Sequence, residues 1–285
     1  CIVDSIQTLY LSTLDSSPGS VSQIRECTSI LITKIKTLDT AVMLVAHINK
    51  DGNIAGPKII EHMVDAVLYF EGEKNNDLRI LRGIKNRYGP AGELAIFSMG
   101  ESGLDQVRNA SAFFIQMMGE DQKGAAAVPV IEGRRVLLVE LQSLVNQTHF
   151  GLPVRVSNGI PQKRLSLIIA VIEKFTGIKL SDYDIYFNIA GGLSIAEPAL
   201  ELGVAASIIS SFKNIPLKKD TAFIGELGLG GEIRPVSGMY KRVNEISKLG
   251  FKMCLGPEMS TKKHSSLNTE YRVCRRISEL ENILF

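Results

Sequence analysis

The sequence predicts an α/β protein built from two domains. Its 285 residues exceed the usual size of one domain. Hydrophobic residues make up 45% of the chain and charged residues 22%, which is typical of a globular protein rather than a disordered one. In the first part of the chain, short apolar runs alternate with amphipathic stretches, as expected when helices cover a sheet.

The first 71 residues predict three strands and two helices in alternation. A short apolar strand, CIV, ends at Asp4 and Ser5. The apolar residues of 21–38 recur at helical spacing, and residues 16–20 (SSPGS) form a loop before them. The remaining elements are a buried strand of the parallel type at 40–48, a short helix at 59–64 and a strand at 66–71.

A charged hairpin is predicted at residues 78–103. Alternating residues indicate strands at 78–84 and 93–99, and the turn between them reads Lys85-Asn86-Arg87-Tyr88-Gly89-Pro90. Two cations at a hairpin tip can reach an anion that another molecule or subunit holds. The alternative is a solvated basic turn, since surface Lys and Arg are common.

A linker and a second domain are predicted after the hairpin. Residues 112–118 complete the first domain, residues 119–127 (GEDQKGAAA) have a linker's composition, and residues 128–285 form the second domain. The second domain opens with a strand at 135–145. The further elements are a helix at 163–176, a strand at 183–189, a helix at 196–212 and a helix at 243–249, and residues 223–227 lead into the segment GLGGEIRPVSGMYKR.

Charge and cysteine content exclude several classes of protein. A net charge of +2 leaves any contact with nucleic acid to local patches. The four cysteines form no CxxC pair, so we expect neither a zinc site nor a disulfide framework. We expect the protein to work in a reducing compartment. Since we find no apolar run of membrane-spanning length and no signal peptide, we predict a cytoplasmic location. A start without Met, on a buried type of strand, predicts a fragment.

The hairpin turn carries a family resemblance. KNRYG, residues 85–89, closely resembles the KNRFG signature of the RadA/Sms family of bacterial recombination ATPases, with Tyr88 in place of Phe. The resemblance includes CIVDSIQT at 1–8 and HINKDGNIAGPKIIEHMVDAVLYFEGE at 47–73, and it continues to the C-terminus. It implies that residues 1–118 are the C-terminal part of a RecA-like P-loop ATPase core. Residues 128–285 would be an α+β Lon-protease-like domain.

The resemblance implies a nucleotide site that uses ATP and Mg²⁺. Asp4 would end a Walker B strand and help to hold Mg²⁺, with Ser5 beside it. His47, at a strand end, would sense the γ-phosphate, and a packed, hydrogen-bonded histidine is an equal alternative. Without the resemblance, the pattern favours Asp4 as the start of the next turn. The chain has no GxxxxGK[ST] phosphate loop, which in the family lies upstream together with a four-cysteine zinc finger.

Contacts with single-stranded DNA are implied for two regions. The polar loop at 49–57 follows a strand end, where open α/β sheets place ligand-binding loops. Lys50 and Lys58 are therefore the candidate DNA contacts of this region. The alternative is an ordinary flexible connection. In the second domain, Arg234, Lys241 and Arg242 could form a basic surface, and a solvated helix face is the alternative for each. Lys85 is a further candidate for DNA contact. His62 is expected to be structural.

The protease resemblance fails at the catalytic dyad. Lon uses a Ser nucleophile and a Lys base, and the matching segments here place Ala199 and Tyr240 at those positions. Ala199 has no hydroxyl group, and Lys241 is about 100° away around a helix. We therefore expect no peptidase activity.

The family implies a DNA-dependent ATPase of homologous recombination and DNA repair. It would process and branch-migrate recombination intermediates as a DnaB-like hexameric motor, with the RecA recombinase as a candidate partner and no role at a membrane. Asp4, Lys85 and Arg87 are the candidate catalytic residues. The rival interpretation is a non-catalytic scaffold for DNA binding and oligomerisation, because the chain lacks a phosphate loop.

Overall fold

The structure, a computed structural model, describes residues 1–38, 40–47, 55–72, 77–107, 111, 122–149, 151–259 and 268–285. The chain divides into two compact units. The first unit contains Cys1–Tyr69 with Arg82–Glu93, and the second contains Phe70–Leu81 with Leu94–Phe285. The predicted mixed α/β class is confirmed, since both units combine helices with strands.

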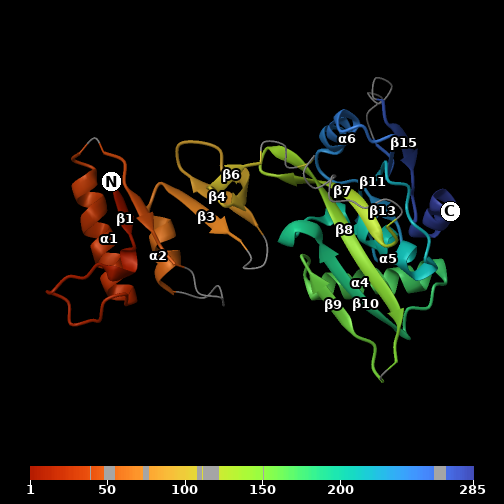
Figure 1. The fold of residues 1–285 in the computed structure, drawn as a ribbon, viewed down its shortest axis with the longest axis horizontal. Helices are drawn as coiled ribbons and strands as arrows, with labels where there is room; N and C mark the ends of the chain where they lie inside the picture. The colour runs from red at the N-terminus through yellow and green to blue at the C-terminus, as the bar shows by residue number, and fades with distance from the viewer. Residues whose placement is uncertain are drawn as a thin grey trace. The chain divides into compact units, whose positions relative to one another are not determined.

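The first unit has two parallel strands and two helices around a small core (Figure 1). Strand β1 (Ile2–Asp4) pairs with β2 (Met43–Val45), and Asp4 lies opposite Val45. Ile6, Ile24 and Ile60 are buried together. They come from the 3-10 helix η1 (Ile6–Thr8), helix α1 (Val21–Ile35) and helix α2 (Ala55–Met63).

The hairpin belongs to a four-stranded sheet with the order β3-β4-β5-β6. Its strands are β3 (Ala66–Glu71), β4 (Leu78–Asn86), β5 (Leu94–Gly100) and β6 (Gly103–Gln106). Two backbone hydrogen bonds close the hairpin, from Gly83 N–H to the Glu93 oxygen at 2.8 Å and from Gly92 N–H to the Gly83 oxygen at 2.7 Å. Because β4 continues to Asn86, Lys85 and Asn86 belong to the strand and not to the turn.

The second unit contains a seven-stranded sheet with the order β15-β14-β11-β7-β8-β10-β9. Strand β8 pairs antiparallel with both β7 and β10. The other pairs are parallel: β9 with β10, β11 with β7 and with β14, and β14 with β15. The strand bounds are β7 (Ala125–Glu132), β8 (Arg135–Gln147), β9 (Arg155–Asn158), β10 (Tyr183–Ile189), β11 (Thr221–Phe223), β14 (Met253–Gly256) and β15 (Glu270–Val273). Strands β12 (Glu226–Leu227) and β13 (Ile233–Arg234) form a separate pair.

Helices cover both faces of this sheet (Figure 1). Helices α4 (Gln162–Thr176) and α5 (Glu201–Lys213) bury Leu165, Ile172 and other apolar residues in the larger core. Helix α6 (Met239–Lys248) packs Val243 and Ile246 against the opposite face. The shorter helical segments are η2 (Ala190–Gly192), η3 (Pro198–Leu200), η5 (Ile277–Glu279) and α7 (Leu280–Leu284).

Several predicted boundaries were wrong. Strand β2 has three residues where nine were predicted, and the predicted helix at 196–212 divides into η3 and α5, because Pro198 begins a separate 3-10 turn. Strand β7 begins at Ala125, inside the predicted linker, because three alanines pack into the sheet as buried residues. Residues 112–118 and 119–121 lie outside the described residues.

Candidate functional site

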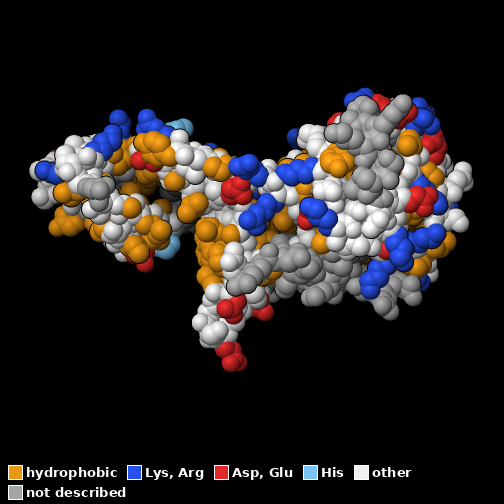
Figure 2. All heavy atoms as spheres, turned by 90° about the horizontal axis from the view of Figure 1, so that it is seen from above, with side chains coloured by type: hydrophobic (Ala, Val, Ile, Leu, Met, Phe, Trp, Pro, Cys, Tyr) orange, Lys and Arg blue, Asp and Glu red, His pale blue; other side chains and the backbone are white. Residues whose placement is uncertain are grey.

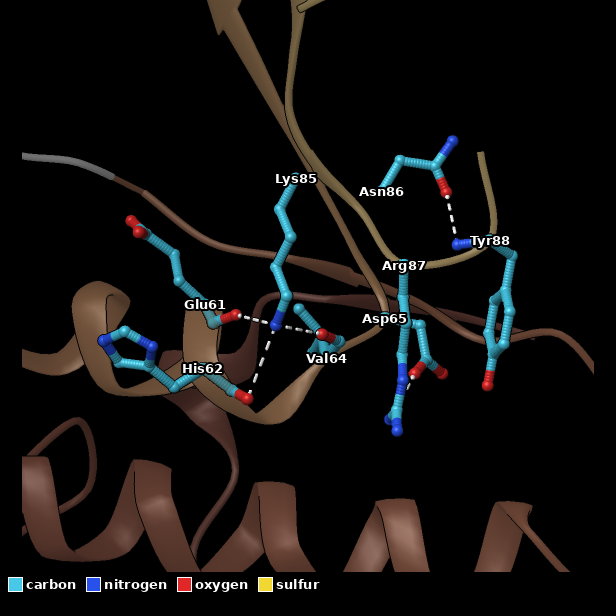
Figure 3. Close-up of polar contacts among 8 residues, drawn as sticks. All are labelled: Glu61, His62, Val64, Asp65, Lys85, Asn86, Arg87 and Tyr88. Atoms are coloured by element: carbon cyan, nitrogen blue, oxygen red, sulfur yellow. Dashed lines mark hydrogen bonds and ion pairs between the residues drawn. The ribbon is translucent and has the colours of Figure 1, made fainter. Parts of the chain in front are cut away.

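The hairpin tip presents the candidate motif at the end of strand β4 (Figure 3). The two cations project to the same side, toward the segment that joins α2 to β3 (Figure 3). This follows from the strand, in which residues two apart share a face. The tip is exposed, and Tyr88 leaves 81% of its surface to solvent.

Lys85 binds the C-terminal end of helix α2. Its Nζ donates hydrogen bonds to the backbone oxygens of Glu61 and Val64, both at 2.8 Å, and to that of His62 at 3.4 Å (Figure 3). The last carbonyl groups of a helix lack partners within the helix, and a cation there is further favoured by the helix dipole. Lys85 therefore closes α2, a role that the sequence analysis did not predict, and its ammonium group is not free in this structure.

Arg87 is the exposed cation of the motif. Its Nη1 lies 3.5 Å from Oδ1 of Asp65, and its backbone N–H donates to the Asp65 backbone oxygen at 2.8 Å. The two side chains are 67% and 59% exposed, respectively. The Tyr88 ring lies 5.9 Å from the guanidinium carbon, within the range of a cation–π contact.

Asn86 and Gly89 shape the turn. The Asn86 Oδ1 accepts a hydrogen bond from the Tyr88 N–H at 3.2 Å, and Asn86 Nδ2 donates to the Pro90 oxygen at 3.4 Å. A Cβ atom at position 89 would lie 2.7 Å from Asn86 Nδ2, closer than real Cβ atoms come. The Asn and Gly of the motif thus have a structural explanation, which leaves Arg87 and Tyr88 as the side chains that the turn presents.

The candidate nucleotide residues gather at one edge of the β1–β2 sheet. Asp4 ends β1, and His47 comes two residues after the last residue of β2. Parallel strands place their carboxyl ends at the same edge. Gln7, in the helix η1 that follows β1, donates from its amide to the His47 backbone oxygen at 3.2 Å. Asp4 is exposed, whereas Ser5 is buried.

One buried oxygen at this edge lacks a partner. Among the described residues, Oε1 of Gln7 is buried and accepts no hydrogen bond. Carboxylate and amide oxygens are the hard ligands that Mg²⁺ prefers. The oxygens of Asp4 and Gln7 therefore fit a Mg²⁺–nucleotide site in their chemistry, and sequence reasoning had missed Gln7.

The candidate DNA residues of the first unit are only partly described. Lys58 is exposed on α2, three residues before Glu61. Lys50 and most of the loop at 49–57 lie outside the described residues.

The candidate basic residues of the second unit have different environments. Arg234 is exposed and paired with Glu232. Lys241 is exposed and donates from Nζ to the Arg134 backbone oxygen, in the turn between β7 and β8. The prediction of a surface role for Arg242 was wrong: its side chain is fully buried and ion-paired with Glu197.

The basic residues near Lys241 line a cavity of about 300 Å³. Arg134, Arg135 and Lys241 contribute to its wall together with Glu245 and with residues of β5, β6 and β8. Lys and Arg side chains also lie among acidic and apolar ones on the face that Figure 2 shows. The cavity is thus a local concentration of positive charge in a chain that is close to neutral.

The two positions of the protease dyad differ in exposure. Ala199 lies in η3 and is fully buried, and its backbone oxygen accepts a hydrogen bond from the Gly225 N–H at 3.2 Å. Tyr240 lies in α6 and is 42% exposed. Neither side chain supplies an aliphatic hydroxyl or an amine for peptide hydrolysis.

The described part of the chain contains no group of three or more His, Cys, Asp and Glu residues placed to hold a metal ion. Within the same residues, no helix has both the length and the apolar character to cross a membrane.

Comparison with known proteins finds close relatives. The chain is 49% identical over 257 residues to DNA repair protein RadA of Halalkalibacterium halodurans and 47% identical over 256 residues to that of Bacillus subtilis. It is 40% identical over 284 residues to DNA repair protein RadA of Pseudomonas aeruginosa. These matches cover 90%, 90% and 100% of the chain, but only 56%, 56% and 63% of the relatives. Residues 158–260 also match a family model described as subunit ChlI of Mg-chelatase.

Proposed function

Because the chain belongs to the RadA family of DNA repair proteins, we propose that it forms part of a DNA-dependent ATPase of homologous recombination and DNA repair. The motor would be a DnaB-like hexameric ring that branch-migrates recombination intermediates on single-stranded DNA. The observation that carries the proposal is Arg87, an exposed guanidinium group on a turn that the Asn86 side chain closes with two hydrogen bonds.

Arg87 acts on the nucleotide of a neighbouring subunit. It is 67% exposed at a hairpin tip, so a second subunit can approach it. A guanidinium group presents paired N–H donors that match the oxygens of a phosphate group. Placed beside the terminal phosphate, Arg87 stabilises the charge that builds up there during phosphoryl transfer.

Asp4, Ser5 and His47 serve the subunit's own nucleotide. The Asp4 carboxylate and the Gln7 amide oxygen would hold Mg²⁺, and His47 at the same edge would lie toward the γ-phosphate. When bound, Mg²⁺–ATP supplies the transferable phosphoryl group and offsets its charge. The residues of this chain orient that phosphoryl group and sense its presence. The phosphate loop comes from the upstream part that the family resemblance implies.

Two surfaces contact DNA. In the first unit, these are Lys50 and Lys58, and Lys58 is exposed on the helix that Lys85 closes. In the second unit, Lys241 with Arg134 and Arg135 lines a basic cavity that suits a backbone phosphate, and Arg234 adds an exposed cation. The RecA recombinase is a further candidate partner through the recombination pathway.

Residues 128–285 act as a Lon-like domain without peptidase activity, after an ATPase part that ends near residue 118. Support comes from Ala199 and Tyr240 at the dyad positions, and from the buried Arg242–Glu197 pair two residues from Ala199. The domain then serves DNA binding and ring formation.

A second candidate function is a non-catalytic scaffold. The basic cavity lined by Arg134, Arg135 and Lys241 favours it, because binding of a backbone phosphate there needs no nucleotide. The two functions differ in one measurement. A scaffold binds DNA and self-associates, and substitution of Arg87 then has no effect on nucleotide turnover.

The test uses a chimera in which the upstream part of the Bacillus subtilis relative precedes residue 1. Arg87→Ala should lower DNA-stimulated ATP turnover by about 10³-fold or more. Arg25→Ala, an exposed arginine of α1 in the same unit, is the matched control and should retain normal turnover. Normal turnover in Arg87→Ala would refute the proposal.

A further inference from the structure

Asp65 contacts Arg87 and has no role in the function proposed above. Asp65 lies two residues after the end of helix α2 and directly before β3, and it contacts Arg87 twice. Its carboxylate lies 3.5 Å from Nη1 of Arg87, and its backbone oxygen accepts the Arg87 N–H at 2.8 Å. Asp65 therefore contacts both the backbone and the side chain of Arg87.

Lys85, the other cation of the motif, cannot replace Arg87 in this contact with Asp65. Lys85 already donates to three backbone oxygens of residues 61–64, and its ammonium group has three N–H donors. Of the two cations in the motif, Arg87 alone ends in an exposed pair. The Tyr88 ring, 5.9 Å from the guanidinium carbon, supplies a further contact for it (Figure 3).

An arginine that acts in trans must be extended before its partner arrives. A free Arg side chain samples many rotamers, and each reaction cycle must then order it again. The Asp65 contact reduces that freedom, yet it is a single long contact between two exposed groups. Such a pair is weak in water, so a terminal phosphate, which carries more charge and offers paired oxygens, can displace the carboxylate.

We propose that Asp65 is the positioning residue of Arg87: it holds the guanidinium group extended at the hairpin tip and releases it to a phosphate of the neighbouring subunit. This inference rests on the proposed function, because it assigns Arg87 a partner phosphate. No covalent step involves Asp65.

The first test needs no nucleotide. In the chain of residues 1–285, the Arg87 Nε–H order parameter reports on side-chain motion on the picosecond-to-nanosecond timescale. We expect Asp65→Asn, which removes the charge at constant size, to lower that order parameter toward the flexible range below about 0.6. The control Glu26→Gln, on the exposed face of α1, should leave it unchanged. An unchanged value in Asp65→Asn would overturn the proposal.

The second test is a double-mutant cycle on DNA-stimulated ATP turnover in the chimera. Asp65→Asn should lower kcat by about 10- to 100-fold with little change in KM, because misplacement of a catalytic group affects the reaction step. In the Arg87→Ala background the same substitution should change kcat less than about 2-fold, because Asp65 acts through Arg87. Asp65→Glu, which keeps the carboxylate, should recover most of the rate.

The outcomes separate the two claims. Normal turnover in Arg87→Ala would contradict the proposed function. If Arg87→Ala is impaired but Asp65→Asn is normal, the function stands and the inference on Asp65 is wrong. An equal loss from Asp65→Asn in both backgrounds would show a role independent of Arg87, and would also overturn the inference.

Discussion

At the scale of single residues, the two cations of the KNRYG turn have different environments. Lys85 was predicted as a partner of Arg87 for phosphate or DNA. The structure places its ammonium group on the last carbonyls of α2 instead. The alternation of a strand predicted that both side chains share a side, but no sequence pattern revealed that a helix end lies there.

The role of Lys85 predicts a loss of stability. Lys85→Met keeps the aliphatic stem but leaves carbonyl groups at the end of α2 without their donor. The expected decrease in the free energy of unfolding is about 1–2 kcal/mol, measured by urea denaturation of the chain. Lys58→Met, an exposed lysine on the same helix, is the control and should stay within about 0.5 kcal/mol. Equal stability of Lys85→Met and wild type would show that Lys85 is a free cation.

At the scale of elements, a buried ion pair joins α6 to the segment before η3. Arg242 is fully buried, pairs with Glu197 and donates to the backbone oxygens of Pro129 at 2.6 Å and Ser237 at 3.0 Å. Glu197 also accepts the Ile131 N–H at 2.9 Å. The sequence analysis gave Arg242 as part of a basic surface or of a solvated helix face, because the distant partner that pairs with it, Glu197, was not visible in the sequence.

Removal of Arg242 leaves the Glu197 carboxylate, which is only 19% exposed, without its cation, and leaves the backbone oxygens of Pro129 and Ser237 without this donor. We expect Arg242→Met to lower the free energy of unfolding by about 3–5 kcal/mol. The double variant Arg242→Met with Glu197→Gln should recover part of that loss, because it removes the remaining charge and keeps an acceptor for Ile131. The check is urea denaturation of both variants. Equal stability of the single and double variants would contradict the account.

A second element-scale feature is a row of polar side chains across β9, β10 and β8. Asn158 donates to Asn188 at 2.8 Å, Asn188 to Gln142 at 3.5 Å, and Gln142 to Oε1 of Glu140 at 3.0 Å. Glu140 is buried, and among the described residues its Oε2 has no partner. Burial raises the pKa of the Glu140 carboxyl above its ordinary value of 4.5, and the hydrogen bond from Gln142 opposes that rise only in part.

The direction of this pKa shift predicts a pH dependence. Since the folded-state pKa lies above the unfolded one, the carboxyl group's contribution to stability is complete below about pH 4.5 and is lost as the pH rises through the folded-state value. Glu140→Gln removes this titration. The variant's free energy of unfolding, minus that of the wild type, should therefore increase from pH 4 to pH 8. Urea denaturation across this range measures the difference, and a constant or falling difference would contradict the prediction.

Elements with a clear period were predicted better than short ones. Residues 163–176, 183–189 and 66–71 agree closely with α4, β10 and β3, because each has a sustained apolar pattern. Strands β9 and β15 have four residues each, and their alternation is too short to separate from a loop. Arg87 was singled out from the KNRYG sequence, and its role stays a prediction; Asp65 and Gln7 were not singled out, because their contacts with Arg87 and His47 join segments far apart in the sequence.

At the scale of the whole molecule, the proposed ATP turnover requires more than one copy of the chain and a phosphate loop, which the 285 residues do not contain. Residues 1–285 alone should show no ATP turnover, because no phosphate loop can bind the β- and γ-phosphates. Phosphate release from the purified chain, with and without single-stranded DNA, measures this. DNA-stimulated turnover above background would contradict it.

The same chain should not cleave peptides. Ala199→Ser should not create activity, because Tyr240 cannot replace a lysine base and position 199 is fully buried. Casein cleavage assays on the wild type and on this variant provide the check, and cleavage by either would refute the interpretation of an inactive Lon-like domain.

The most direct measurement of the central claim mixes two inactive forms of the chimera. One form carries Arg87→Ala, and the other carries a defective phosphate loop. Some interfaces in the mixed rings then combine an intact nucleotide site with an intact Arg87 from the next subunit. If Arg87 acts on the nucleotide of a neighbouring subunit, DNA-stimulated ATP turnover should therefore partly recover. No recovery at any ratio, with mixed rings shown to form, would contradict the account and assign Arg87 a role within its own subunit.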